Sequence, residues 1–154
     1  INYYIPMGNT SSSIKKVNFE NIIDFQKKPS GLLISTLSQS EQTCLINNTV
    51  PSSEEESIIN NALYSNKKIE IYVYGKNSHD MTVVSKAKQL IELGFSNVYI
   101  YVGGLFEWLL LQEIYSDDSF KTNGVELDLL KYRPPKCLRD SEHPLRLTNF
   151  SANS

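Results

Sequence analysis

Short apolar segments alternate with segments of helical periodicity along most of this chain, and this alternation restricts its fold more than any other feature. Four apolar runs have the length of a buried strand, at residues 31–37, 43–46, 69–74 and 97–102. A parallel crossover needs a helix, and that helix must bury one side on the sheet. The alternation therefore predicts an α/β fold whose central parallel sheet is flanked by helices on both faces.

Helical patterns fill the intervals between these runs. Residues 19–25 repeat apolar side chains at helical spacing, and a second helix can begin after Pro51. The apolar side chains of residues 83–91 share one helical face, which should end at Gly94 because glycine is the usual residue at a helix C-terminus. Residues 105–115 form a helical segment that is apolar on nearly all sides.

The length of 154 residues fits one domain. Polar, Ser-rich composition predicts a flexible arm at residues 1–16, followed by the folded domain at 17–116. We expect a C-terminal extension at 117–154 that is largely irregular, with one helix at 125–132.

Composition excludes several functional classes. The formal charge of −2, without a long basic run, argues against nucleic-acid binding. No stretch approaches the roughly 20 apolar residues of a membrane-spanning helix. Cys44 and Cys137 lack metal-ligand spacing, so neither a disulfide scaffold nor a metal or cofactor site is expected. We expect an intracellular, cytoplasmic protein with a protein partner, and the oligomeric state stays open.

The loop after the run at 69–74 is the candidate site, because ligands of parallel sheets bind beyond the carboxyl ends of the strands. An anion-binding or nucleophilic loop would carry a thiol and positive charge. This loop has no cysteine and places an acid where the anion would lie. Its residues are Gly75, Lys76, Asn77, Ser78, His79 and Asp80.

Ser78, His79 and Asp80 are the residue types of a hydrolase triad, but adjacent residues on one loop cannot form a relay that is assembled from distant segments. Capping of the following helix by Ser78 or Asp80 is the expected role instead.

Three segments, at residues 72–75, 90–99 and 103–108, resemble the rhodanese-homology domain. In that family the third strand ends in the catalytic cysteine, whose loop leads into a helix that ends at Gly-Phe. A further strand then runs into Gly-Gly and an aromatic helix. The resemblance covers residues 17–116 and is strongest at 69–108, and it implies a rhodanese-like fold.

Residues 103–115 are similar to a block in the divergent rhodanese-like proteins of giant DNA viruses and some protists. This closer resemblance implies a viral or protist protein, with association to the virion as one role.

The chain departs from the family at the catalytic position. The family's cysteine aligns with Gly75, and the arginine that often follows aligns near Asp80. The resemblance then implies a catalytically inactive binding or structural module. The alternative is a sulfurtransferase that uses Cys44, although a cysteine between Thr43 and Leu45 is more often a small core residue.

Two other features suggest partners. Gly8 follows Met7 in a good N-myristoylation signal if translation starts at Met7, which would add a peripheral membrane contact; otherwise this segment is a flexible leader. The all-round apolar helix should be mainly core, but its surplus apolar surface suggests an interface. The candidate interface residues are Leu105, Phe106, Trp108 and Leu109.

Overall fold

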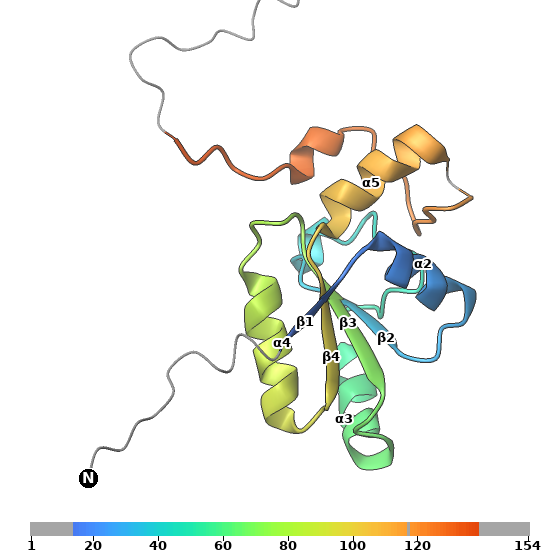
Figure 1. Cartoon of the computed structure of the whole chain (residues 1–154), viewed down its shortest axis with the longest axis vertical. Helices are drawn as coiled ribbons and strands as arrows, with labels where there is room; N and C mark the ends of the chain where they lie inside the picture. The colour runs from blue at the N-terminus through green and yellow to red at the C-terminus, as the bar shows by residue number, and fades with distance from the viewer. Residues whose placement is uncertain (1–13, 117, 139–154) are drawn as a thin grey trace, which may run out of the picture.

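The computed structural model describes residues 14–116 and 118–138, which form a four-stranded sheet with helices on both faces (Figure 1). The strands are β1 (Lys15–Val17), β2 (Leu32–Ser35), β3 (Glu70–Tyr74) and β4 (Asn97–Tyr101). They lie in the order β1-β4-β3-β2, and every neighbouring pair is parallel. The predicted α/β architecture with a central parallel sheet is confirmed.

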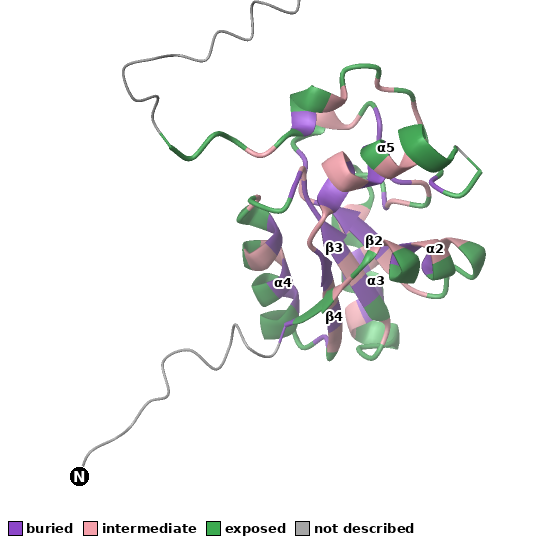
Figure 2. Ribbon diagram, turned by 45° about the horizontal axis from the view of Figure 1, so that its top comes forward, coloured by how far each residue is buried: buried purple, intermediate pink, exposed green. Residues whose placement is uncertain are grey.

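The α-helices of the described ranges are α2 (Phe19–Lys27), α3 (Glu55–Ser65), α4 (Thr82–Leu93) and α5 (Gly104–Tyr115). Two short 3-10 helices are η1 (Gln39–Glu41) and η2 (Leu129–Tyr132). Helices α2 and α5 pack with one face of the sheet, and α3 and α4 pack with the other. Figure 2 shows the outcome, with largely buried strands β2, β3 and β4 inside and exposed outer sides on the helices. None of the helices in the described ranges is long and apolar enough to cross a membrane.

Strands β2, β3 and β4 bury side chains on both faces of the sheet. In β2, Leu33 joins the core beneath α2 and α5, whereas its neighbour Ile34 joins the core beneath α3 and α4. Tyr74 and Val73 divide in the same way in β3. Successive strand residues point to opposite faces, so a sheet covered on both sides needs nearly continuous apolar strands, and this is the pattern the sequence has.

Helix α4 fixes where the candidate loop lies. It buries Val83, Ala87 and Leu90 against the sheet and ends at Gly94, whose φ of 114° is left-handed. Glycine adopts this conformation at little cost, so the predicted helix end is confirmed. The fixed helix holds the β3–α4 connection at the carboxyl edge of the sheet.

Residues 43–46, which the sequence predicts as a strand, do not form one. Ile46 makes a single antiparallel bridge to the C-terminal segment, and its N–H donates to the Tyr74 hydroxyl at 3.1 Å. The N–H of Leu45 donates to Asn123 Oδ1 at 2.8 Å. Side chains therefore satisfy these backbone donors, and no neighbouring strand is needed for them.

The structure also differs from the expected domain boundaries. Residues 15 and 16, assigned to the arm, belong to strand β1 and pair with β4. The C-terminal segment supplies Phe120 (4% exposed) and Tyr132 (1% exposed) to the core beneath α5. Of the helix expected at 125–132, only the short η2 forms. The folded unit therefore extends beyond 17–116 at both ends.

Helix α5 holds the C-terminal segment through polar contacts as well. The indole Nε1 of Trp108 donates to the Lys121 carbonyl at 3.2 Å, and Nε2 of Gln112 donates to the Phe120 carbonyl at 2.7 Å. The rings of Trp108 and Phe120 meet edge to face with centroids 5.1 Å apart. This packing directs the following residues back toward the carboxyl edge of the sheet.

Candidate functional site

The candidate site is the β3–α4 loop, residues 75–81, which packs against the start of α5. The N–H of Leu105 donates to the Gly75 carbonyl at 2.9 Å, and the N–H of Phe106 donates to the Lys76 carbonyl at 2.8 Å. The first N–H groups of a helix have no partner inside the helix and often bind ligands. In this protein two such groups of α5 bind the loop instead.

Gly104 allows this close approach. Its φ of +67° lies in the left-handed region. A Cβ at this position would lie 2.7 Å from the Gly75 carbonyl oxygen and 2.9 Å from the Asn77 nitrogen. A larger residue would therefore have to push the loop away from α5, so glycine is required on two separate grounds.

The carboxylate of Asp80 fills the interior of the loop. Its Oδ2 accepts the Lys76 N–H at 3.0 Å, and its Oδ1 accepts the N–H and the hydroxyl of Thr82 at 3.1 and 2.5 Å. A Cβ at Gly75 would collide with this carboxylate and with the Val83 side chain. The Lys76 and Thr82 N–H groups, two of the backbone donors that could hold an anion, are therefore already occupied by an acid of the same loop.

Asn77 ties the loop to the C-terminal segment. Its side chain is buried, its Nδ2 donates to the Tyr132 carbonyl at 3.0 Å, and its Oδ1 accepts the His79 N–H at 2.9 Å. One amide side chain thus orders both the loop and a carbonyl that lies 55 residues away in the sequence.

An open depression of about 350 Å³ lies over the loop, between the end of β2 and the C-terminal segment. Lys76 Nζ is 2.7 Å from Glu41 Oε1 on its rim, and Asp80 also lines it. The hydrogen bond from Lys76, with further help from Ser38, lowers the pKa of the Glu41 carboxyl. Two acids against one lysine give no net attraction for an anionic ligand. In the described ranges no three His, Cys, Asp or Glu side chains gather to hold a metal ion.

Comparison with protein families gives a match over half of the chain. The model of the rhodanese-like domain matches residues 35–111, which run from the end of β2 to the middle of α5. This chain belongs to the rhodanese-like domain family. A comparison with curated proteins gives no match.

Solved structures share the rhodanese-like fold at low sequence identity. A protein of Bacillus halodurans is 14% identical with a TM-score of 0.54, and the match covers 75% of this chain and 81% of that chain. A protein of Anabaena sp. is 21% identical with a TM-score of 0.51, covering 71% and 82%. A polysulfide-sulfur transferase of Wolinella succinogenes is 17% identical with a TM-score of 0.50, covering 66% and 77%. These likenesses concern the fold.

The six loop residues predicted as the site do lie together in the rhodanese-like domain, but they play different parts. Asp80 accepts the Thr82 N–H at the start of α4, but the N-cap position of this helix is Met81, so neither Ser78 nor Asp80 is the N-cap residue that the sequence predicted. Ser78 and His79 are exposed. The His79 ring lies near Cys137, outside the Ser-His-Asp run, so the adjacent residues form no relay.

Cys44, the alternative thiol, is fully buried among the core side chains beneath α5. Its Sγ donates to the Gly124 carbonyl at 3.4 Å, and burial raises the pKa of the thiol. A raised pKa keeps the group as the unreactive thiol, and burial denies access to a sulfur donor. The expected role as a small core residue is the one its position supports.

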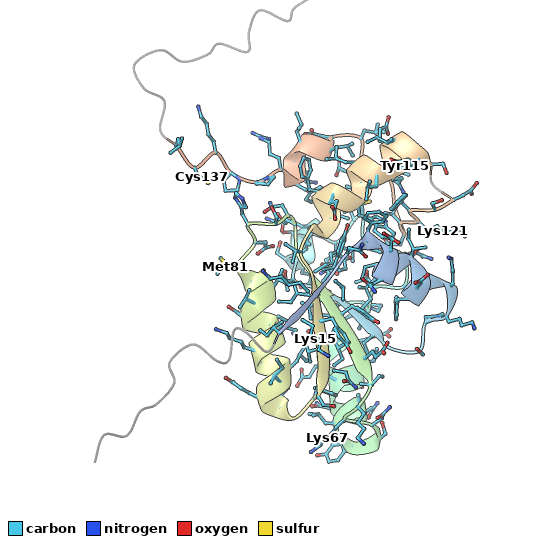
Figure 3. All side chains as sticks on the ribbon, in the orientation of Figure 1. Lys15, Lys67, Met81, Tyr115, Lys121 and Cys137 are labelled. Carbon is cyan, nitrogen blue, oxygen red and sulfur yellow. The ribbon has the colours of Figure 1, made fainter. Side chains whose placement is uncertain are left out.

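Cys137 was not connected with the site by sequence reasoning. Its Sγ lies 4.0 Å from His79 Nδ1, although 58 positions separate the two residues in the sequence. Figure 3 shows Cys137 above the N-terminal end of α4, near Met81. No local sequence pattern predicts this contact, because it depends on the path of the C-terminal segment.

The interface expected on α5 must be corrected. Leu105, Trp108 and Leu109 are buried in the core of this chain, and Phe106 is half-buried against it. The sheet, α2 and the C-terminal segment cover the side chains that looked surplus in the sequence. Ile114 is one of the exposed apolar residues of this helix. The candidate lipidation residue Gly8 lies outside the described residues.

Proposed function

We propose that this rhodanese-like domain is a binding or structural module that does not transfer sulfur at its β3–α4 loop. The observation that carries the proposal is the position of Asp80, whose carboxylate accepts the Lys76 and Thr82 N–H groups inside the loop. Sulfur transfer at this place needs a thiolate and donors that stabilise it. The alignment drawn from the family resemblance puts Gly75 at the cysteine position, and a hydrogen atom cannot accept sulfur.

Electrostatics supports the same proposal. A sulfur donor such as thiosulfate is an anion and would have to approach the Asp80 carboxylate. Two like charges 4 Å apart at an effective dielectric constant near 20 repel by roughly 4 kcal/mol. A repulsion of this size weakens the binding of the anion roughly a thousandfold. Lys76 does not offset this repulsion, because it is already paired with Glu41.

The competing function is sulfur transfer by a thiol outside the loop, since one structural neighbour is a polysulfide-sulfur transferase. In such a step a thiolate attacks the outer sulfur of thiosulfate, the S–S bond of thiosulfate breaks, sulfite leaves, and a persulfide remains on the protein. Intact mass before and after thiosulfate, with a cyanide chase, detects this product. We expect no cyanide-labile gain of one sulfur atom.

Matched variants make the mass experiment decisive. Cys44→Ser and Cys137→Ser assign any sulfur to one thiol, and the double variant gives the baseline. A gain that disappears in Cys44→Ser would establish the original alternative, and a gain that disappears in Cys137→Ser would place chemistry on the C-terminal segment. Either gain would overturn an inactive module.

We also propose a peripheral membrane role if translation starts at Met7, because Gly8 then becomes a myristoylation site. A single myristoyl chain binds membranes only marginally and reversibly, so a protein partner would provide the second contact. Protein that begins at Met7 and is co-expressed with a myristoyltransferase should float with anionic liposomes, and Gly8→Ala should not. Equal flotation of the two would contradict the proposal.

A virion-associated or protist role is proposed on one feature, the likeness of residues 103–115 to the rhodanese-like proteins of giant DNA viruses and some protists. The corresponding expectation is that the chain is enriched by mass spectrometry in purified particles of its source virus. Its absence from such particles would leave the intracellular binding module without the virion role.

A further inference from the structure

The residues after η2 run from a buried anchor toward the mouth of the β3–α4 loop. Tyr132, at the end of η2, is 1% exposed, and its carbonyl accepts the Asn77 side-chain N–H at 3.0 Å. Helix η2 also packs against α5. The chain therefore leaves a fixed point that is joined to both elements of the site.

The conformation after this anchor is stiff and extended. Arg133 has φ −59° and ψ 151°, the polyproline II conformation, and Pro134 and Pro135 follow. Proline fixes its own φ and holds the preceding residue in the extended region. A polyproline II chain rises about 3.1 Å per residue, so the steps from Arg133 to Cys137 span about 12 Å. The segment can therefore cross the mouth of the loop at a small cost in conformational entropy, because its backbone is already restricted.

The far end of the segment touches the loop again. Pro135 lines the depression over the loop, together with Lys76 and His79. Cys137 Sγ lies 4.0 Å from His79 Nδ1. Pro135 and Cys137 are themselves exposed, so this end rests on the loop without being buried in it.

We propose that residues 133–137 form a strap that partly closes the open depression over the loop, with Pro135 on its rim, Asn77 and Tyr132 as the fixed end of the strap and Cys137 as its releasable end. The occupant of this face is thus the protein's own extended, proline-containing segment. This inference rests on the proposed binding function in one respect: a partner that uses the loop must first displace the strap.

Cross-linking tests whether the strap lies on the loop in solution. In His79→Cys, mild oxidation of the full chain should join positions 79 and 137, seen as a loss of two hydrogens in intact mass and as a linked peptide after digestion. The matched control is Ser78→Cys, which is also exposed and lies one position away. A strap whose far end lies at position 79 should give at least about a tenfold faster cross-link than the control, because the effective concentration of Cys137 there is high. Equal rates in the two variants would overturn the strap.

The stiffness of the strap gives a second test. Pro134→Gly together with Pro135→Gly, made in the His79→Cys background, should slow the cross-link by roughly fivefold to twentyfold, because the freed chain has more conformations to lose. Pro51→Gly, outside the residues that line the depression, should leave the rate unchanged. An unchanged rate in the double-glycine variant would overturn the preorganised strap.

Closure itself is measured by hydrogen exchange of the loop amides at residues 75–82. The oxidised His79→Cys protein should exchange more slowly there than the same protein reduced, and the double-glycine variant should exchange faster. Identical exchange in all forms would contradict closure. None of these readouts involves sulfur transfer, so a persulfide would overturn the proposed function and leave the strap standing, whereas a failed cross-link would overturn the strap alone.

Discussion

The β3–α4 loop and the C-terminal segment at residues 118–138 meet at one site, yet they are held in opposite ways. The interior of the loop is shaped by short-range bonds, since Asp80 binds the backbone of Lys76, four positions earlier, and of Thr82, two positions later. The C-terminal segment is held by long-range bonds, since Asn77 binds the carbonyl of Tyr132, 55 positions later.

This difference separates two properties of the site. Short-range bonds determine what the interior of the loop contains, and in this chain it contains a carboxylate. Long-range packing determines what covers the loop, and in this chain the cover is the segment that follows α5. Changes in the two regions should therefore have separable effects, and the following variants test that separation.

The largest effect is expected where the C-terminal segment enters the core. Phe120→Ala removes a ring that is 4% exposed and lies against Trp108 and Phe19. Truncation of a buried aromatic ring should lower the free energy of unfolding by about 3 kcal/mol or more, measured by urea denaturation. Leu127→Ala, at a side chain that is 91% exposed, is the control and should change it by less than about 0.5 kcal/mol. Similar losses in the two variants would mean that this segment is not part of the core.

The contact between the loop and α5 gives the next largest effect. Gly94→Ala and Gly104→Ala both place alanine at a positive φ, but a Cβ at Gly94 meets only the Lys67 side chain at ordinary distance. Gly94→Ala should cost about 1 kcal/mol of unfolding free energy from backbone strain alone. Gly104→Ala should cost about 3 kcal/mol, because its Cβ also presses on the loop backbone. Equal losses would show that the loop does not need this close approach.

The interior of the loop should have a smaller effect on stability. Asp80→Ala removes the acceptor for the Lys76 and Thr82 N–H groups and should cost about 1–2 kcal/mol of unfolding free energy. Glu92→Ala on the exposed side of α4 is the control and should be nearly neutral. If Asp80→Ala is also neutral by urea denaturation, the carboxylate does not hold the loop, and the case against an anion site there is weakened.

The same contrast explains how much the sequence could predict. The parallel sheet and the end of α4 at Gly94 depend on local periodicity and spacing, and the structure contains them. The predicted cap is displaced by one position, because Met81 is the N-cap of α4 and Asp80 precedes it. The strand predicted at residues 43–46 was wrong, because an apolar run of this length can also be an irregular segment of the core. Its backbone N–H groups bind side chains of distant residues, Tyr74 and Asn123.

The C-terminal segment could not be read from its sequence. Phe120 is an isolated aromatic residue in a polar stretch, and an isolated residue has no period. Tyr132 belongs to the stretch at 125–132 that predicted a helix, of which only η2 forms. The helix at 105–115 looked apolar all round because this segment covers one of its sides. The contact between Cys137 and His79 follows from that path and has no local signal.

The smallest expected effect concerns the attachment of the loop to the β2 side, between Glu41 and Lys76. Because the hydrogen bond from Lys76 lowers the pKa of Glu41 below its ordinary value of 4.5, the pair stabilises the fold above that pH and loses this contribution as the pH falls through the folded-state pKa. Glu41→Gln should lower the free energy of unfolding by about 0.5 kcal/mol at neutral pH. At a pH well below 4.5 the difference from the parent should vanish. Glu56→Gln on α3, an exposed acid, should show no such change between the two conditions. If Glu41→Gln lowers the free energy of unfolding by the same amount at both pH values, the effect comes from packing and not from charge. The contact between the loop and the β2 side would then depend on packing of the side chains.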